Sequence, residues 1–220
     1  MKKLILSMAL MLTATFLFAQ NKMAEGMITY SVQWKLPESM QAMAANLPSE
    51  LKVYFKGDSS SMKSESQMFT TTSILNLNKE YERLLLDIPM MGKKLSVIMS
   101  PADQERMQET FPDLSLKAGT ETKTVAGYKA LKYDVNDKKS NQNFAAWFTK
   151  DVEVAPNALT RFYDKSYGFP VEFSTFMNGM TLSATLKEIK AVTVPAGSFS
   201  ASKDFEEITF DQLMQMSGKR

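Results

Sequence analysis

An Asn-Gly pair near the C-terminus, Asn178-Gly179, constrains the fold of this chain more than any other part of the sequence. Asn-Gly is the preferred centre of a type I′ β-turn, whose twist matches that of two antiparallel strands, so the pair predicts a hairpin and sets its register. Met177 then lies opposite Met180, and alternation along both strands brings one largely apolar set to a single face. That set comprises Val171, Phe173, Thr175, Leu182, Ala184 and Leu186.

Alternating apolar and polar residues predict strands through most of the chain. Residues 28–34 and 51–55 place an apolar side chain at every second position, as a strand with one buried face requires. The same reasoning, together with turn residues between the segments, predicts further strands. These cover residues 62–67, 69–77, 81–88, 94–99, 144–148 and 205–208.

A second hairpin is predicted at Ala126-Gly127, which separates two alternating runs. A two-residue turn at this point brings Glu121 opposite Lys132 on the solvated face of the hairpin. The opposite charges of these two side chains agree with that register.

A short helix is predicted between Pro37 and Pro48. Met40, Met43, Ala44 and Leu47 follow the spacing i, i+3, i+4, i+7, which places them on one stripe of an α-helix. The helix interrupts the sheet early in the chain.

Two further helices are predicted from their N-terminal caps. Ser100 supplies a capping hydroxyl and Pro101 suits the first helical position, so a helix is expected to run to about Phe111. Thr209 and Gln212 have the spacing of a capping box before a terminal helix. Combined with the strands, these helices predict an α+β fold that is mainly antiparallel β.

The N-terminal segment predicts export from the cytoplasm. Two lysines precede an apolar run over residues 4–18, which ends at the small residue Ala19. This pattern is typical of a secretory signal peptide over residues 1–19 that is cleaved near Ala19, and it leaves a single domain over residues 20–220. No later apolar run is long enough to span a bilayer, so we expect no transmembrane segment and a location in the periplasm or outside the cell.

The composition narrows the classes of function. The chain has no Cys and no His, which removes thiol nucleophiles, imidazole acids and bases, and the usual zinc ligands. Loss of Lys2 and Lys3 with the signal leaves 24 of the 26 basic side chains against 24 acidic ones. A neutral chain gives no electrostatic reason to expect a nucleic-acid partner. We therefore expect neither an enzyme nor a nucleic-acid-binding protein.

The 17 methionines leave one metal hypothesis open, because clustered thioethers suit Cu(I). The alternative is that methionine fills cores and adaptable grooves, which explains the same residues without a metal. We expect no metal site and no cofactor.

Two carboxylate clusters are the remaining candidates for acid–base chemistry. Glu206 and Glu207 are adjacent in a predicted strand, so they point to opposite faces and cannot serve one cleft. Residues 134–137 lack the ligand spacing of a calcium loop and are expected to form a solvated turn. No catalytic residue is predicted.

Four short segments, together with the signal peptide, carry a resemblance to a known group of proteins. They are residues 25–30 (EGMITY), 124–130 (TVAGYKA), 146–151 (AWFTKD) and 194–196 (VPA). In this order they resemble a family of exported bacterial domains near the outer-membrane lipoprotein-carrier (LolA-like) superfamily. The resemblance implies a strongly curved, unclosed β-barrel whose apolar concave face is covered by short helices and can hold an acyl chain.

Two functions follow from these observations. The first is a soluble periplasmic protein that binds an apolar ligand, a lipid or a lipoprotein acyl chain, on the concave face. The second is a non-enzymatic structural or interaction protein of the cell envelope with a filled core. Under the first hypothesis the groove is lined by Trp34, Met40, Met43, Leu47, Phe55, Phe173, Met177, Met180 and Leu182. The sequence leaves the oligomeric state open.

The first hypothesis assigns a role to the helix between the two prolines. Met40, Met43 and Leu47 are expected to form a movable cover over Trp34 and Phe55. The alternative is a static helix that caps a dry core.

Overall fold

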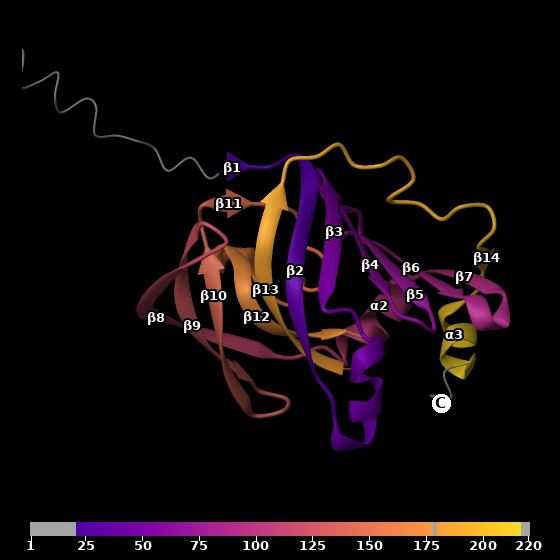
Figure 1. The fold of residues 1–220 in the computed structure, drawn as a ribbon, viewed down its shortest axis with the longest axis horizontal. Helices are drawn as coiled ribbons and strands as arrows, with labels where there is room; N and C mark the ends of the chain where they lie inside the picture. Colours follow the sequence, from indigo (N-terminus) through magenta and orange to yellow (C-terminus); the bar gives the residue numbers. More distant parts are fainter. Residues whose placement is uncertain (1–20, 178–179, 217–220) are drawn as a thin grey trace, which may run out of the picture.

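The computed structural model describes residues 21–177 and 180–216 (Figure 1). The predicted signal segment and the Asn178-Gly179 pair lie outside the described residues. The described helices are α2 (Pro101–Gln108) and α3 (Phe210–Met216), with 3₁₀ segments η1 (Glu38–Asn46), η2 (Leu77–Lys79), η3 (Pro89–Met91) and η4 (Lys165–Tyr167). The strands are β1 (Asn21–Lys22), β2 (Glu25–Lys35), β3 (Glu50–Lys56), β4 (Ser59–Glu65), β5 (Thr70–Asn76), β6 (Tyr81–Ile88), β7 (Lys93–Ile98), β8 (Leu114–Val125), β9 (Tyr128–Asp137), β10 (Gln142–Thr149), β11 (Val152–Glu153), β12 (Phe169–Met177), β13 (Met180–Lys190) and β14 (Glu206–Glu207).

Twelve of the described strands form one open sheet, in the order β14-β7-β6-β5-β4-β3-β2-β13-β12-β10-β9-β8. Neighbouring strands are antiparallel except for β14, which pairs with β7 in parallel. The two short strands β1 and β11 form a separate parallel pair. The strands at the two ends of the large sheet, β8 and β14, do not pair with each other, so the sheet is unclosed. This arrangement confirms the predicted α+β, mainly antiparallel fold.

Both predicted hairpins have the expected register. In the first, Thr175 lies opposite Leu182 and Met177 opposite Met180. In the second, Thr122 lies opposite Leu131, and the register shifts between Ala118 and Thr122. Glu121 falls within this shift, and it forms an ion pair with Lys132 at 2.5 Å. Its turn residues Ala126 and Gly127 have φ values of 49° and 87°, the positive values that a type I′ turn requires at both central positions.

The segment between Pro37 and Pro48 is helical, but as the 3₁₀ helix η1 rather than the predicted α-helix. A short segment between two prolines forms few intrahelical hydrogen bonds, which favours the tighter turn. With three residues per turn, positions i and i+3 still align, whereas i+7 does not. The predicted stripe of Met40, Met43 and Leu47 therefore does not hold as one face of a regular α-helix.

The predicted caps of α2 and α3 are both present. Ser100 Oγ accepts a hydrogen bond from the Asp103 backbone N–H, and the Asp103 side chain accepts one from the Ser100 backbone N–H. The α2 helix ends at Gln108, earlier than the predicted Phe111. Pro112 disfavours helical backbone at Phe111, so the helix does not run to the predicted end, and Thr110 and Phe111 form i→i−3 turns instead.

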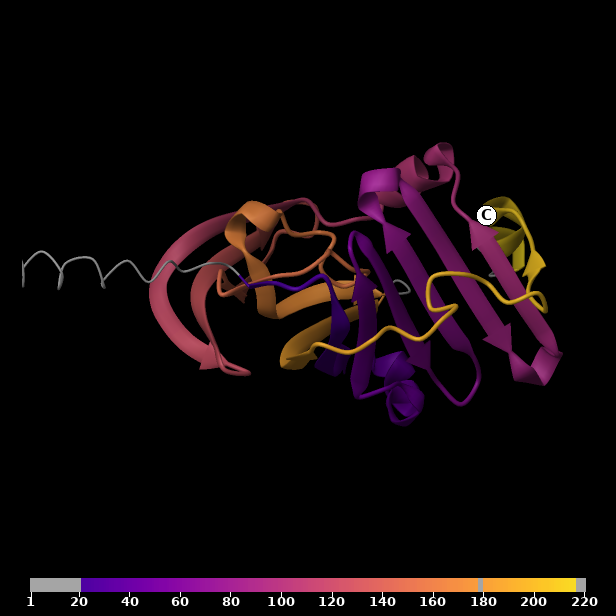
Figure 2. The same ribbon diagram turned by 90° about the horizontal axis from the view of Figure 1, so that it is seen from above.

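One face of the sheet, the core face, is covered by the segment of residues 154–168, which lies inside the bend of the sheet (Figure 2). The Tyr163 ring packs edge-to-face against Phe173, with centroids 5.6 Å apart, and against Phe148 at 5.3 Å. The Thr175 hydroxyl donates to the Leu159 carbonyl oxygen at 2.8 Å. Leu159 is fully buried. The segment of residues 154–168 therefore contributes side chains to the core although most of it has no regular secondary structure.

Candidate ligand pocket

The chain after β13 crosses the opposite face of the sheet, the outer face. Residues 191–205, the strap, pass over β3 to β7 without regular secondary structure (Figure 2). Pro195 has no N–H for a strand ladder, and Gly197 has φ 84°, so the sequence favours turns. The Ser198 hydroxyl donates to the Pro195 carbonyl oxygen at 2.7 Å. The strap is therefore held by its own turns and by side-chain contacts to the sheet.

A carboxylate holds each end of the strap. At its start, the Val194 backbone N–H donates to Glu25 Oε1 at 2.6 Å, and this hydrogen bond is the main cause of the lowered pKa of Glu25. At its end, Lys94 Nζ donates to Asp204 Oδ2 at 2.7 Å. Hydrogen bonds from Lys94 and then Ser202 lower the pKa of Asp204 to about 2. Both carboxylates are therefore stabilised in the charged form that anchors the strap.

An open pocket of about 520 Å³ lies between the strap and the outer face. This volume falls within the range of roughly 300–1,000 Å³ typical of small-molecule sites. The sheet contributes Tyr54, Ser61, Lys63, Thr70, Thr72, Leu85 and Asp87, and the strap contributes Ala196, Gly197, Ser198, Ser200, Ser202 and Phe205.

The strand register explains why these sheet residues meet. Tyr54 on β3 lies opposite Ser61 on β4. Thr72 on β5 lies opposite Lys63 on β4 and Leu85 on β6. Because alternate residues share a face, four consecutive strands present these side chains to the strap.

The pocket has hydrogen-bonding capacity that the protein does not use. The hydroxyl-bearing side chains contributed by the sheet are Tyr54, Ser61, Thr70 and Thr72. Within the described part of the chain, none of these four hydroxyl groups has a hydrogen-bond partner. Each hydroxyl can both donate and accept, so the pocket can meet a ligand that offers both kinds of group.

The charges around the pocket are paired with opposite charges. Lys63 forms an ion pair with Glu65 on the same strand. Asp87 lies 3.7 Å from Lys94, the same ammonium that holds Asp204. Lys94 is therefore shared by two carboxylates, and the charged groups around the pocket carry one negative charge in excess, which disfavours an anion.

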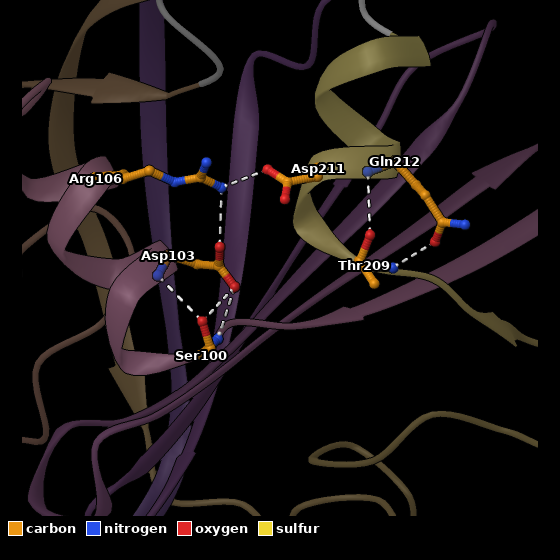
Figure 3. Close-up of polar contacts among 6 residues, drawn as sticks. All are labelled: Ser100, Asp103, Arg106, Thr209, Asp211 and Gln212. Carbon is orange, nitrogen blue, oxygen red and sulfur yellow. Dashed lines mark hydrogen bonds and ion pairs between the residues drawn. The ribbon is translucent and has the colours of Figure 1, made fainter.

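A second hollow of about 570 Å³ lies where α2 and α3 meet the edge of the sheet. Figure 3 shows Arg106 Nη2 between Asp103 Oδ1 at 3.0 Å and Asp211 Oδ1 at 2.8 Å. The other polar groups drawn there form the N-terminal caps of the two helices. In the cap of α3, the Gln212 backbone N–H donates to Thr209 Oγ1 at 3.2 Å. The polar groups in Figure 3 are thus bonded to one another, which fits a role in docking the two helices.

The carboxylate clusters noted in the sequence do not form an acid–base pair. Glu206 lies opposite Leu95, whereas Glu207 lies opposite Ser96 and accepts a hydrogen bond from Arg83 at 3.4 Å. Residues 134–137 lie in β9 rather than in the predicted solvated turn, because their backbone pairs with both β8 and β10. Asp137, the last residue of the strand, is 4% exposed. Burial by itself raises its pKa, but hydrogen bonds, that from Ser140 the largest, outweigh burial and lower it. Among the described residues, no three carboxylates lie close enough together to hold a metal ion.

The predicted groove residues on the strands lie mostly in the core. Phe55, Phe173 and Leu182 are at most 2% exposed and pack in one continuous cluster. Trp34 is half-buried against that cluster, and its Nε1 donates to the Pro48 carbonyl oxygen at 2.7 Å. These side chains are brought together, as predicted, in a packed arrangement.

The other predicted groove residues lie at the end of the sheet that carries η1. Leu47 and Met180 are half-buried. The side chains outside the described part of the structure are those of Met40, Met43 and Met177.

Three exposed methionines that the sequence analysis did not single out lie at this same end. Met68 is 48% exposed, Met90 83% and Met91 57%. Their turns lie at the same end of the sheet as η1, because antiparallel pairing returns β4–β5, β6–β7 and β12–β13 to the end where β2 finishes. Met68, Met90 and Met91 are called the methionine end below.

Sequence reasoning missed the strap pocket. A signal was present in the hydroxyl-rich strands, SSSMKSE in β4 and TTTSILN in β5. Such strands place hydroxyl groups on both faces of a sheet, where one face is normally apolar. The crossing of a segment more than a hundred residues later is not encoded in that local pattern.

Comparisons with known proteins give information on the fold alone. No family model and no curated protein matches the sequence. Among solved structures, the chain is similar to the structure of PNGF-II in the C2 space group, with a TM-score of 0.54 and 14% sequence identity. The similarity covers 89% of this chain and 33% of that chain, so this chain spans about a third of the length of PNGF-II. No described helix is both long and apolar enough to cross a membrane.

Proposed function

We propose that this chain is a non-catalytic binding protein of the periplasm or the extracellular space, with a filled core and a ligand site in the strap pocket. The observation that carries the proposal is the set of four pocket hydroxyl groups without a partner in the described part of the chain. Hydroxyl groups that have no partner within the protein are available to bond a ligand, so this set supports an external partner. The packing of Phe55, Phe173 and Leu182 supports the filled core.

A chemical block tests this assignment. The chain has no cysteine, so Ser198→Cys creates a single thiol in the lining of the pocket, and Thr124→Cys creates one on an exposed part of β8. Amide NMR spectra of the protein without maleimide are recorded with neutral sugars, charged sugars, amino acids and fatty acids. We expect one class of compound to shift the amide signals of Thr72 and Gly197. A bulky maleimide on residue 198 should abolish these shifts, whereas the same maleimide on residue 124 should leave them unchanged. Shifts confined to the core face, or none in the pocket, would refute the proposal.

An apolar ligand remains a second candidate, favoured by the exposure of Met68, Met90 and Met91. Methionine is flexible and polarisable, and it adapts to variable apolar partners. A lipid or lipoprotein acyl chain bound there would lie at the end of the sheet that carries η1. Binding between Phe55 and Phe173 would require these side chains to give up their packing, so the methionine end is the more accessible entry. Fluorescent fatty-acid titration of the wild type tests this candidate.

A finer description of the fold belongs to the same proposal. The sheet is proposed to be a strongly curved, unclosed barrel of the lipoprotein-carrier type, with short helices over its concave face. The bent course of β8 and β9 in Figure 2 supports the curvature. An experimental structure of the protein tests it through the path of these strands.

A further inference from the structure

We propose that the strap pocket binds a neutral, polyhydroxylated compound of saccharide size. The inference rests on the proposed function, because it names the ligand class of the same pocket. Three properties of the lining carry it, namely its hydroxyl groups, its charge and its apolar surfaces.

The first property is the kind of hydrogen-bonding group. Thr70 and Thr72 on β5 face the pocket beside Ser61 on β4, and Tyr54 adds a phenolic hydroxyl. A hydroxyl group donates one hydrogen bond and accepts two. A ligand hydroxyl has the same dual capacity, so a sugar can satisfy several such groups in more than one orientation. A carboxylate or phosphate only accepts, so it would leave the acceptor lone pairs of the pocket hydroxyl groups unused.

The second property is the charge. Lys63 and Asp87 are the two charged side chains that line the pocket, and each lies near an opposite charge. An anion would have to displace Glu65 from Lys63 to gain an ion pair, and it would face the excess negative charge of Asp87 and Asp204, which share Lys94. A cation would compete with Lys94 for the Asp87 carboxylate. The exchange of one ion pair for another yields little net free energy at an exposed site. The lining therefore favours a neutral ligand.

The third property is apolar surface on both walls. Leu85 and the Tyr54 ring lie on the sheet side, and Phe205 lies on the strap side, where Lys94 Nζ is 5.9 Å from its ring centroid. A sugar ring has hydroxyl groups at its rim and C–H groups on its faces. Its faces can lie against the aromatic and aliphatic side chains while its rim meets the hydroxyl groups.

The strap completes the pocket and explains how a ligand reaches it. Residues 196–205 contribute backbone and side chains to one wall, and their attachment depends on Glu25 and Asp204 at the two ends. Turns joined by few hydrogen bonds to the sheet have low local stability. A strap of this kind can admit a ligand without unfolding the sheet beneath it.

The test is a titration of the full mature chain with glucose, galactose, N-acetylglucosamine and maltose, followed by NMR. Glucuronate, glucosamine and a fatty acid serve as charged and apolar comparisons. We expect saturable shifts at Thr72 and Gly197 with at least one neutral sugar, and at least tenfold weaker binding of the charged sugars.

Matched variants assign the binding to the hydroxyl groups. Thr72→Val removes a hydroxyl from the pocket, whereas Thr71→Val makes the same change on the other face of the same strand. We expect about fivefold weaker binding for Thr72→Val, from the loss of about one hydrogen bond, and no change for Thr71→Val. Tyr54→Phe provides a second test if Thr72→Val alters the fold.

Different outcomes separate the two proposals. Binding of a charged or apolar compound in the pocket, with no neutral sugar bound, overturns the ligand class and leaves the strap pocket as the site. Sugar binding that is unchanged in both Thr72→Val and Tyr54→Phe overturns the assignment of that binding to the pocket hydroxyl groups. If no compound of any class shifts the pocket residues, the proposed function fails together with the ligand class.

Discussion

Arg161 Nη1 and Glu82 Oε1 lie 2.7 Å apart, and the side chain of each residue is 12% exposed. The pair joins the segment that covers the core face to β6, across 79 residues of sequence. The Arg161 guanidinium also lies 5.0 Å from the Phe111 ring centroid. Three segments that are distant in the sequence therefore meet at one guanidinium.

Removing one partner of this pair should destabilise the protein. Glu82→Gln leaves the Arg161 charge partly buried without its counter-charge, so we expect a loss of about 2–3 kcal/mol in the free energy of unfolding, somewhat below the cost for fully buried pairs. Urea denaturation measures the change. The exposed pair Lys190–Glu188 provides the control, and Glu188→Gln should cost less than about 1 kcal/mol. Equal effects of the two substitutions would show that the Arg161 contact does not fasten the covering segment.

Acid should release the C-terminal end of the strap. The pKa of Asp204 is lowered from 3.8 to about 2 in the folded protein, chiefly by its hydrogen bond from Lys94. A lowered folded-state pKa contributes stability above the unfolded pKa, and this contribution is lost as the pH falls through the folded value. The strap should therefore loosen between about pH 4 and pH 2.

Amide hydrogen exchange of strap residues 196–205 measures this loosening. Asp204→Asn should give fast exchange in the strap already at pH 5 and remove the contribution of Asp204 to the acid transition. Asp58→Asn, in the turn between β3 and β4, should leave the strap unchanged. A strap that exchanges equally in wild type and Asp204→Asn at pH 5 would contradict the anchoring role.

Gly168 should not tolerate a side chain. It has φ 105°, and an added Cβ would lie 2.4 Å from the Thr149 carbonyl oxygen. We expect Gly168→Ala to cost at least about 2 kcal/mol, because strain from positive φ adds to a backbone clash. Gly57 also has positive φ, but an added Cβ meets nothing within 4 Å, so Gly57→Ala should cost only about 1 kcal/mol. Thermal unfolding of both variants checks the difference.

The proposed cover helix gives a prediction for the second candidate function. If η1 gates an apolar site, replacing both Met40 and Met43 with Asp should abolish uptake of a fluorescent fatty acid and leave the circular dichroism of the sheet unchanged, because charged side chains disfavour contact with an acyl chain. Failure of the wild type to bind the probe, or unfolding of the double variant, would remove the gate hypothesis. The filled-core protein would then be the remaining hypothesis for this region.

Much of the local structure was predictable from the sequence. The alternation around residues 28–34 predicted a strand because its period is a property of the extended backbone itself. The registers on both sides of Asn178-Gly179 and Ala126-Gly127 followed from turns that are two residues long. The caps at Ser100 and Thr209 were predictable for the same reason, since a cap involves residues only three positions apart.

The tertiary structure decided which apolar side chains form a core and which polar ones form a pocket. Phe55 and Phe173 have the same alternation whether their face is open or packed, and only the return of residues 154–168 fills it. Likewise, Thr72 becomes part of a pocket because a strap that follows more than a hundred residues later crosses β5. The sequence determined the period, register and ends of the elements through local backbone geometry. The contacts between distant segments depend on the path of the whole chain, and these contacts decided where a ligand can bind.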